Sequence, residues 1–332
     1  MRALIRTGPS KSLTLTSDLP EPSSSDSSQS YIIRTHATAL TRDELTWPEP
    51  LSIDVPIPGF DLAGTIISAP TTASAKFKPG DEVYALTTST WQGNAKEVSI
   101  AVENELSLKP KNMNWEEAAS VPLSALSAWQ ALFVHGRLTP PSSEQNMKSQ
   151  NSGKRVLVTA ASGGVGIWGV QLAHLAGAEV VGTCGSSNVE FVKGLGADVA
   201  LDYTETNLKE WVDENKDARG FDVVLDCIGG QTLEDAWKSV RKGGRVVSVA
   251  EPPDGKNPKE GLAEGVEGVW FIVEPNGGQL GEITRLIERG ECKGMVDSVF
   301  SLEQWSEAFE RLQGGHVKGK VVLRLDREIE RH

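Results

Sequence analysis

The chain has 332 residues, of which 39% are hydrophobic and 23% charged, a composition typical of a globular protein with about two domains. Its 33 basic and 45 acidic side chains give a net charge of −12, which disfavours binding to nucleic acid and to anionic membrane surfaces. The three cysteines, Cys184, Cys227 and Cys292, are too few for a disulfide framework or a four-cysteine zinc site.

The N-terminal segment MRALIRTGPSKS has neither the apolar core of a secretory signal nor the arginine-rich amphipathic pattern of an organellar presequence. No apolar run reaches the ~20 residues that a membrane-spanning helix needs. We therefore expect a cytoplasmic protein without membrane or nucleic-acid partners, present as a monomer or a homodimer.

Residues 1–125 contain short β-branched runs separated by Gly, Pro, Asp and Ser, a pattern typical of a β-rich barrel or sandwich. The predicted strands are residues 3–6, 13–16, 31–37, 64–67, 82–86 and 96–100. Residues 20–30, PEPSSSDSSQS, offer nothing to bury and are predicted to form a solvated loop.

Residues 126–275 alternate apolar strands with amphipathic helices, which predicts an α/β domain with a doubly wound parallel sheet. The predicted strands are residues 156–159, 180–183, 199–201, 223–225, 245–249 and 269–273. The polar residues 140–153 are predicted to form an exposed insertion.

The tail, residues 276–332, contains two amphipathic helices and a closing strand at residues 320–325, and it does not continue the α/β alternation. We therefore expect residues 276–332 to complete the first domain, 1–125, and residues 126–275 to form the second.

The most informative segment is residues 156–166, VLVTAASGGVG, in which a buried strand runs through a glycine turn directly into a helix. Such a turn lets the backbone approach a pyrophosphate, and the helix start offers free N–H groups. The alternative is a tight strand–helix connection without a ligand, but the flanking α/β pattern favours dinucleotide binding. The candidate binding residues are Ala161, Ser162, Gly163, Gly164, Val165 and Gly166.

The next strand ends in residues 182–188, GTCGSSN, where an NAD site usually places an acidic residue for the ribose 2′-hydroxyl. Because no carboxylate occurs there, NADPH is favoured over NADH, although residues 182–192 also lack the arginine or lysine that usually pairs with a 2′-phosphate. Ser187 or Asn188 can alternatively cap the helix that follows. The candidate 2′-phosphate residues are Gly185, Ser186, Ser187, Asn188 and Tyr203.

Several motifs follow in order along nearly the whole chain: IPGFDLAG at 57–64, FKPGDEV at 77–83, AASVP at 118–122, SAWQAL at 127–132, LGAD at 195–198, GGR at 243–245 and GKVV at 319–322. In these motifs the chain resembles the zinc-independent medium-chain dehydrogenases/reductases of the quinone-oxidoreductase-like and enoyl-reductase-like type. The resemblance implies a GroES-like catalytic domain and a Rossmann NADP-binding domain.

The chain differs from the zinc-dependent members of that family at the residues that bind the metal. Those members carry a cysteine where this chain has Thr41, and Gly-His-Glu where it has Gly59, Phe60 and Asp61. Phenylalanine cannot ligate zinc and threonine is a poor ligand, so we expect no metal. Many zinc-independent members have an asparagine at position 41 and an aspartate three residues later, where this chain has Thr41 and Glu44.

The resemblance implies a metal-free, NADPH-dependent oxidoreductase that transfers a hydride to an activated C=C bond, as in an α,β-unsaturated carbonyl, or to a quinone. Negative charge then develops on the carbonyl oxygen, and hydrogen-bond donors stabilise it. Thr41 and Tyr84 are the candidate catalytic residues, and Thr41 is also a candidate near the nicotinamide or its ribose. Further candidates around the cofactor are Val249, Ala250, Phe271, Lys318 and Gly319, and Trp91 is a candidate pocket residue.

Two alternatives remain open at this point. The first is a trans-acting enoyl reductase of a polyketide or other natural-product pathway, which performs the same chemistry on a different substrate. The second is an NADPH-binding structural or interaction protein with weak catalysis, because fold does not fix function.

Overall fold

The computed structural model describes residues 1–7, 12–23, 29–47, 55–72, 74–88, 92–141, 150–258 and 260–326. Trp91, most of the predicted insertion at 140–153 and the middle of the predicted loop at 20–30 lie outside these residues. The chain divides into two compact units. Unit 1 comprises Met1–Leu126 and Glu274–His332, and unit 2 comprises Ser127–Val273.

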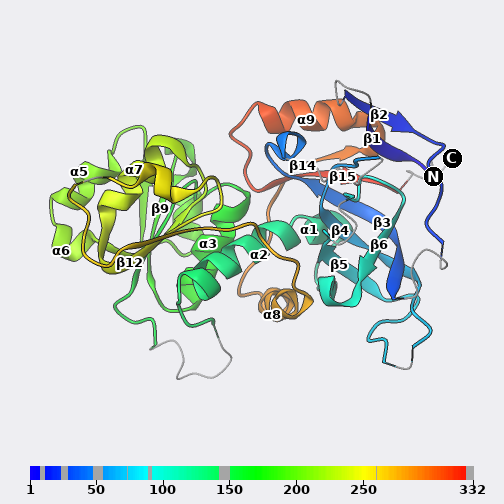
Figure 1. Cartoon of the computed structure of the whole chain (residues 1–332), viewed down its shortest axis with the longest axis horizontal. Helices are drawn as coiled ribbons and strands as arrows, with labels where there is room; N and C mark the ends of the chain where they lie inside the picture. Colours follow the sequence, from blue (N-terminus) through cyan, green and yellow to red (C-terminus); the bar gives the residue numbers. More distant parts are fainter. Residues whose placement is uncertain are drawn as a thin grey trace. The chain divides into compact units, whose positions relative to one another are not determined.

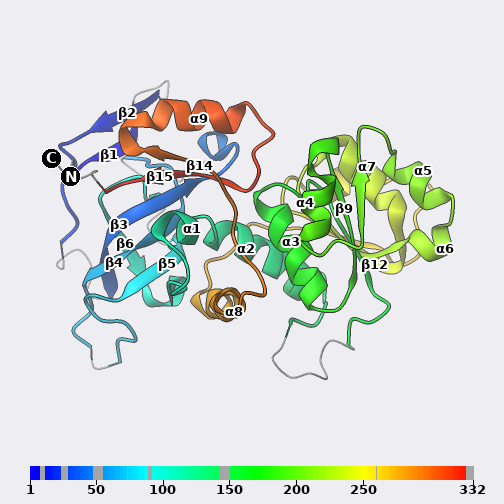
Figure 2. The same ribbon diagram turned by 180° about the vertical axis from the view of Figure 1, so that it is seen from behind.

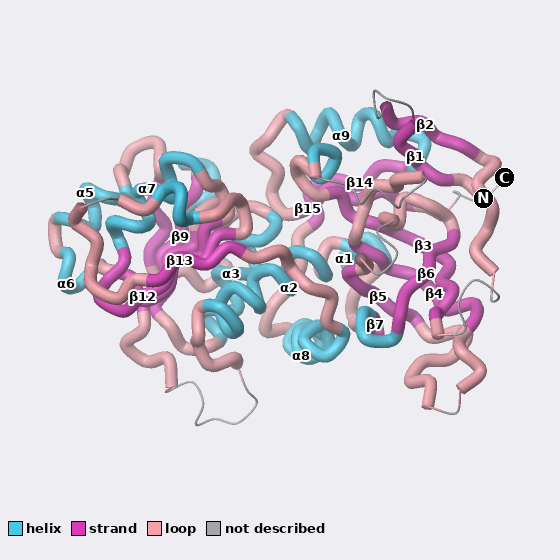
Figure 3. Tube along the Cα trace, in the orientation of Figure 1, coloured by secondary structure: helices cyan, strands magenta, loops and turns pink. Residues whose placement is uncertain are grey.

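Unit 1 is built on a mixed sheet with the strand order β14-β15-β3-β4-β5-β7, in which β6 also pairs with β3 (Figure 3). The strands of this sheet are β3 (Ser30–Leu40), β4 (Asp61–Ser68), β5 (Glu82–Leu86), β6 (Val98–Val102), β7 (Leu106–Leu108), β14 (Val296–Ser301) and β15 (Lys320–Arg324). The strands β1 (Ala3–Thr7) and β2 (Ser12–Thr16) form a separate antiparallel pair.

The tail of the chain contributes to this sheet directly. Strand β15 pairs antiparallel with the second half of β3, and β6 pairs with its first half. The helix α9 (Trp305–Gln313) buries Ala308, Phe309 and Leu312 in one core with residues of β1, β3 and β15. The other helices of unit 1 are α1 (Trp115–Ala119), α8 (Gly277–Glu288) and most of α2 (Pro122–Trp129).

Unit 2 contains a parallel sheet with the strand order β10-β9-β8-β11-β12-β13. Its strands are β8 (Arg155–Val158), β9 (Glu179–Cys184), β10 (Val199–Asp202), β11 (Phe221–Asp226), β12 (Val240–Ser248) and β13 (Glu267–Trp270). Its helices are α3 (Gly164–Leu175), α4 (Val189–Gly194), α5 (Leu208–Asp213), α6 (Lys216–Arg219) and α7 (Gly230–Ser239).

Helices cover both faces of this sheet, as the sequence pattern predicts. Leu157 and Val224 share one core with side chains of α5 and α7, which lie in front of the sheet in Figure 1. On the opposite face, shown in Figure 2, α3 packs so closely that a Cβ at Gly169 would lie 2.7 Å from a methyl group of Leu225. The fold class is therefore α/β, with a doubly wound parallel sheet in unit 2 and a β-rich sheet in unit 1.

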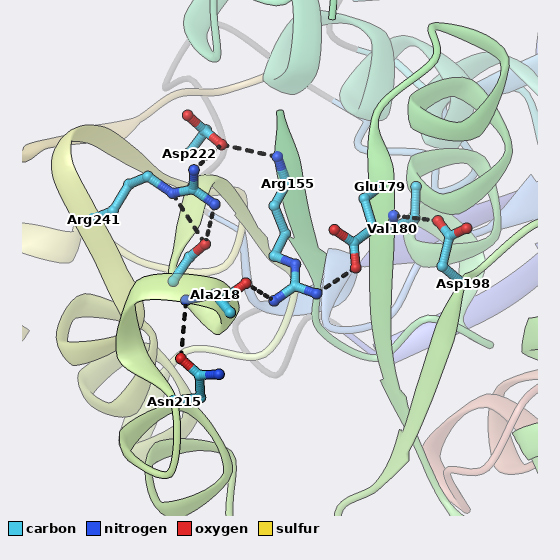
Figure 4. A network of polar contacts seen from close by, with 9 residues as sticks. Arg155, Glu179, Val180, Asp198, Asn215, Ala218, Asp222 and Arg241 are labelled. Atoms are coloured by element: carbon cyan, nitrogen blue, oxygen red, sulfur yellow. Dashed lines mark hydrogen bonds and ion pairs between the residues drawn. The ribbon is translucent and has the colours of Figure 1, made fainter. Parts of the chain in front are cut away.

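The amino ends of the parallel strands carry a network of charged side chains (Figure 4). Arg155, at the start of β8, forms an ion pair with Glu179 and donates a hydrogen bond to the carbonyl of Ala218. Asp222 accepts a hydrogen bond from the backbone N–H of Arg155 at 2.8 Å, and Arg241 lies 3.5 Å from the same carboxylate. This network joins strands and loops at the amino edge of the sheet, whereas ligands of open α/β sheets bind at the carboxyl edge.

No helix among the described residues is both long enough and apolar enough to span a membrane.

Candidate functional site

The turn after β8 has the geometry that an anion requires. Ala160 adopts a positive φ of 48°, and the N–H of Gly163 donates to its carbonyl at 2.8 Å. Helix α3 then begins at Gly164 with no side-chain cap and no acidic residue in its first turn. The N–H groups of a helix's first turn lack intrahelical partners and carry positive partial charge, so this end of α3 suits a negatively charged group.

Gly166 fixes how closely the helix approaches the turn. A Cβ at this position would lie 2.1 Å from the carbonyl oxygen of Ala160, a distance that real Cβ atoms do not show. The glycine is therefore needed for packing, independently of any ligand. Gly163 is less restricted, because its Cβ would lie 3.2 Å from the same oxygen.

The turn lies where the direction of the chain through the sheet reverses. From β8 the chain adds β9 and β10 on one side, and then returns to add β11, β12 and β13 on the other. The carboxyl ends of β8 and β11 therefore border the switch point at which open α/β sheets bind their ligands.

Asp226, at the end of β11, connects the carboxyl ends of neighbouring strands by hydrogen bonds. The sequence did not predict this role. Its carboxylate accepts hydrogen bonds from the hydroxyls of Thr159 at 3.1 Å and Ser248 at 2.8 Å, and from the N–H of Gly229 at 3.0 Å. Burial raises the pKa of this carboxyl. Because Thr159 follows β8 and Ser248 ends β12, Asp226 joins the carboxyl ends of three adjacent strands.

The loop after β9 presents the residues predicted to bind a 2′-phosphate. Ser186 and Ser187 are exposed, and the hydroxyls of Ser186 and Thr204 lie 3.2 Å apart. Tyr203 is 58% exposed and packs beside Gly185. Asn188 makes no side-chain cap to α4, so the alternative capping role has no hydrogen bond there.

Asp202 ends the neighbouring strand β10 and brings a carboxylate to this loop. It accepts hydrogen bonds from the hydroxyl of Thr204 at 2.7 Å and from its N–H at 3.0 Å. Hydrogen bonds from Ser186 and Thr204 lower the pKa of Asp202. The search for an acidic residue in the sequence covered residues 182–188 and missed Asp202, which parallel pairing places opposite Cys184 and directly before the candidate Tyr203.

The nicotinamide candidates of unit 2 follow β12 and β13. The N–H of Val249 donates to the carbonyl of Asp226 at 3.0 Å, and the N–H of Ala250 lies 3.2 Å from the hydroxyl of Ser248. The rings of Phe271 and His135 contact each other at a tilt of 36°, with their centroids 4.3 Å apart. The structure thus places Val249 and Ala250 on the carboxyl edge held by Asp226.

In unit 1, four side chains from three separate segments form a cluster that contains one buried ammonium group, that of Lys320. We call Thr41, Glu44, Asp61 and Lys320 the Lys320 cluster. Strands β3 and β15 pair with Leu40 opposite Val321, so Lys320 lies beside Thr41. The ammonium of Lys320 donates to the Thr41 hydroxyl at 2.8 Å and lies 3.2 Å from Asp61 Oδ2.

Asp61 and Glu44 are both buried in this cluster. The Oδ1 atom of Asp61 accepts the N–H of Leu123 at 2.7 Å, and Glu44 Oε2 lies 3.3 Å from the N–H of Thr41. Burial raises the pKa of Asp61, against the opposing effect of Lys320. Burial raises the pKa of Glu44 to about 8, again opposed by Lys320.

The Lys320 cluster does not fit a zinc ion. Zinc requires about four nitrogen, sulfur or oxygen ligands, and this site offers a hydroxyl at position 41 and a phenyl ring at position 60. Both oxygens of Asp61 are engaged, one by Leu123 and the other by Lys320. Among the described residues, no group of three or more His, Cys, Asp or Glu side chains could hold a metal ion.

Tyr84, predicted as a second catalytic residue, is fully buried. Its hydroxyl lies 2.8 Å from the Thr284 hydroxyl and 3.2 Å from the carbonyl of Leu280, both on α8. Burial raises its pKa above the ordinary value. The geometry gives this side chain a clear structural role, namely attaching α8 to the sheet.

Lys318 and Gly319 directly precede Lys320. The N–H of Lys318 donates to Asp297 at 3.0 Å. Gly319 has a φ of 84°, and a Cβ there would lie 2.1 Å from the carbonyl oxygen of Met295. The sequence analysis selected these two residues but not Lys320, whose position became evident only from the register of β15 on β3.

The comparisons with known proteins agree with this architecture. Residues 195–323 match the family described as "Zinc-binding dehydrogenase". The chain is also similar in structure to the quinone oxidoreductase from Coxiella burnetii, with a TM-score of 0.79, 23% identity and coverage of 98% of this chain and 99% of the other.

Curated relatives match most of the chain. It is 44% identical to a "Probable zinc-binding oxidoreductase, mitochondrial" of Arthroderma benhamiae, covering 96% of this chain and 94% of the relative. It is 32% identical to the zebrafish (Danio rerio) "NAD(P)H oxidoreductase RTN4IP1, mitochondrial", covering 80% and 71%. It is 34% identical to the tomato (Solanum lycopersicum) "2-methylene-furan-3-one reductase", covering 80% of this chain and 63% of the relative.

The names of the first two relatives place those proteins in mitochondria, so they lend no support to a cytoplasmic location for this chain. The chain belongs to the zinc-binding-dehydrogenase-like family of medium-chain dehydrogenases/reductases, with a GroES-like unit and a Rossmann unit.

Proposed function

We propose that this protein is an NADPH-dependent, metal-free reductase of activated C=C bonds, as in α,β-unsaturated carbonyl compounds, or of quinones. The observation that carries the proposal is the uncapped start of α3 behind the Ala160 turn, at the switch point of the parallel sheet. The relatives named as an NAD(P)H oxidoreductase and as a 2-methylene-furan-3-one reductase support the cofactor class and the substrate class respectively. The compound in the second name, a 2-methylene-furan-3-one, is itself a conjugated ketone.

The residues proposed to hold the cofactor form three groups in unit 2 and one in unit 1. They are Ala161, Ser162, Gly163, Gly164, Val165 and Gly166 for the pyrophosphate; Gly185, Ser186, Ser187, Asn188 and Tyr203 for the 2′-phosphate; Val249, Ala250 and Phe271 for the nicotinamide; and Thr41, Lys318 and Gly319 from unit 1.

The choice of NADPH over NADH depends on the loop after β9. Its exposed hydroxyls can donate to a 2′-phosphate, whereas Asp202 would instead suit a ribose 2′-hydroxyl. Both hydrogen bonds from Thr204 reach Oδ1 of Asp202, and a carboxylate can accept more than two, so the preference for NADPH rests on the exposed hydroxyls. We expect calorimetry to show NADPH binding about tenfold or more tightly than NADH, a difference of ~1.4 kcal/mol. Equal affinities, or tighter binding of NADH, would reverse the assignment.

Held by the residues named above, NADPH would supply the hydride that reduces the β-carbon of the substrate. As the hydride arrives, the electrons of the C=C bond move toward the carbonyl oxygen, which becomes an enolate oxygen. The Thr41 hydroxyl is the protein donor proposed to stabilise that oxygen, and water supplies the proton to the α-carbon. Removing one such donor typically costs ~100-fold or more in kcat. Tyr84 has no part in this scheme because its hydroxyl is occupied within the core.

The decisive experiment measures NADPH oxidation by the purified protein with simple enones and quinones, before and after treatment with a metal chelator. Activity that is unchanged by the chelator supports the metal-free assignment, and loss that zinc restores would reject it. Binding of NADPH without turnover of any substrate in a broad panel would favour the alternative of a binding protein. Cytoplasmic location also remains a prediction, which subcellular fractionation tests directly.

A further inference from the structure

Lys320 in unit 1 is a charged residue that is almost completely buried. It is 4% exposed, and it lies with the fully buried Asp61 beneath Thr41, which is only partly buried. The sequence analysis assigned Lys320 no role, and the proposed reaction as stated above does not use it.

The chemistry of an ammonium group determines the direction of the hydrogen bond between Lys320 and Thr41. A lysine ammonium has three donors and no acceptor, so the Thr41 oxygen must accept the 2.8 Å bond. The hydroxyl proton of Thr41 therefore points away from Lys320. No described residue accepts that proton, which leaves it available to an acceptor outside the protein.

The remaining groups of the cluster keep the ammonium in place. Asp61 lies 3.2 Å from it and is held from its other side by the N–H of Leu123. Glu44 accepts the N–H of Thr41 and so fixes the backbone that carries the hydroxyl. A cation held in a buried site acts through a low effective dielectric, which strengthens its effect on a hydroxyl in direct contact.

We propose that Lys320 is a positioning residue that orients and polarises the Thr41 hydroxyl, so that Thr41 donates its proton in a hydrogen bond to the carbonyl oxygen of the substrate. This inference rests on the function proposed above and names the source of positive charge in a site that does not fit zinc. No covalent bond to Lys320 or Thr41 forms or breaks. The hydride goes to the β-carbon, the electron pair moves to the oxygen, and Lys320 stabilises the resulting charge through Thr41.

The test compares kcat, KM and NADPH affinity in four variants. Thr41→Val removes the hydroxyl without changing the shape, and Thr41→Ser retains it. Lys320→Met/Asp61→Asn removes the charged pair together, because Lys320→Met alone would leave a buried carboxylate unpaired and can prevent folding. The fourth variant combines Thr41→Val with Lys320→Met/Asp61→Asn.

We expect Thr41→Val to lower kcat by roughly 100-fold, as for loss of one oxyanion donor, and Lys320→Met/Asp61→Asn to lower it by at least about tenfold. KM and the NADPH dissociation constant should stay within about threefold, because the effect belongs to the transition state. The combined variant should be no slower than Thr41→Val, since Lys320 acts through Thr41. Thr41→Ser should be close to the unmodified protein.

Lys109 and Glu82 provide the matched control in the same unit. Lys109 is also buried, and its ammonium also lies 3.2 Å from a carboxylate. Lys109→Met/Glu82→Gln removes a buried lysine together with its carboxylate partner, which is 56% exposed, without a hydrogen bond to Thr41, so kcat should be retained. A second readout needs no cofactor: in the free protein, the shifts in unfolding midpoint caused by Thr41→Val and by Lys320→Met/Asp61→Asn should be less than additive.

Each other outcome contradicts the inference in a distinct way. If Thr41→Val is slow while Lys320→Met/Asp61→Asn keeps full kcat, Lys320 does not position the hydroxyl. If the two losses multiply, the residues act independently. If the unmodified protein binds NADPH but reduces no enone or quinone, the proposed function is wrong, and the proposed role of Lys320 is then wrong as well.

Discussion

Glu44 shows how one buried side chain can make stability depend on pH. It is 4% exposed, and its Oε1 atom has no hydrogen-bond partner among the described residues. Because burial raises its pKa from 4.5 to about 8, the folded protein keeps a proton that the unfolded chain releases between these values. A group that binds a proton more tightly in the folded state favours folding less as pH rises.

We therefore predict that Glu44→Gln becomes progressively more stable relative to the unmodified protein between pH 4.5 and 8. The glutamine keeps an acceptor for the N–H of Thr41 and has no proton to lose. The full shift corresponds to on the order of 5 kcal/mol, which sets an upper limit to the gain. Urea denaturation at pH 5 and pH 8.5 measures it. Parallel stability curves for the two proteins over this range would contradict the raised pKa.

The Ala160 turn gives a prediction about a single glycine. Gly166→Ala would place a Cβ 2.1 Å from the Ala160 carbonyl oxygen, so either the turn or the start of α3 must move. We expect NADPH affinity to fall by at least about tenfold, together with a loss of stability of ~1–3 kcal/mol from the overpacking. The matched control is Gly194→Ala, because Gly194 ends α4 and a Cβ there meets nothing within 4 Å. Unchanged affinity in Gly166→Ala would contradict the pyrophosphate assignment.

At the scale of elements, helix α8 depends on a small polar contact beneath it. Tyr84 on β5 and Thr284 on α8 share a hydrogen bond of 2.8 Å in a fully buried position. The hydroxyl of Thr284 also lies 3.0 Å from the carbonyl of Leu280, so Thr284 retains a partner when Tyr84 is changed. This arrangement separates a structural role from the catalytic role that the sequence analysis gave Tyr84.

We predict that Tyr84→Phe lowers the free energy of unfolding by about 1 kcal/mol, the usual value of one buried hydrogen bond. Its kcat and KM should equal those of the unmodified protein. Chemical denaturation and steady-state kinetics on the same preparation measure both quantities. A large loss of kcat with unchanged stability would restore Tyr84 as a catalytic residue.

The elements that the sequence predicted well are those with a strong local pattern. The strands of unit 2 and the turn that starts α3 carry continuous apolar runs and glycines, and the structure has them within a few residues of the predicted bounds. Strand β13 is a partial exception: residues 269–273 were predicted, but β13 ends at Trp270, and Ile272 is 70% exposed.

Contacts that depend on the pairing of strands far apart in the chain could not be predicted from the sequence. Strands β7 and β14 were not predicted because β7 has only three residues and β14 is partly exposed along its length. Lys320 reaches Thr41 across 279 positions, and Asp226 gathers hydroxyls from two other strands. Hydrophobic periodicity contains no information about such a register. The local motifs could therefore indicate the two candidate sites, but the charged residues within them became visible only from the strand pairing.

At the scale of the whole molecule, ligand binding and unfolding are linked. A ligand that binds only the folded state stabilises it by an amount set by its concentration relative to its dissociation constant, ~2.7 kcal/mol at a hundredfold excess. The part of the proposed site that belongs to unit 2 lies among described residues, with its turn, loop and strand ends already formed. Binding therefore needs little rearrangement of that unit, and the stabilisation should appear directly in its unfolding.

We predict that NADPH raises the unfolding midpoint of the protein by several degrees, and that NADH at the same concentration raises it less. Adenosine 2′,5′-bisphosphate, which carries the 2′-phosphate but no nicotinamide, should produce part of the NADPH shift if Ser186, Ser187 and Asn188 bind that phosphate. Gly166→Ala should lose most of the NADPH shift, and Gly194→Ala should keep it. Scanning calorimetry of these proteins with each nucleotide measures the shifts. Equal shifts with NADPH and NADH would contradict the phosphate preference, and no shift with either would remove the dinucleotide site on which the proposed reaction depends.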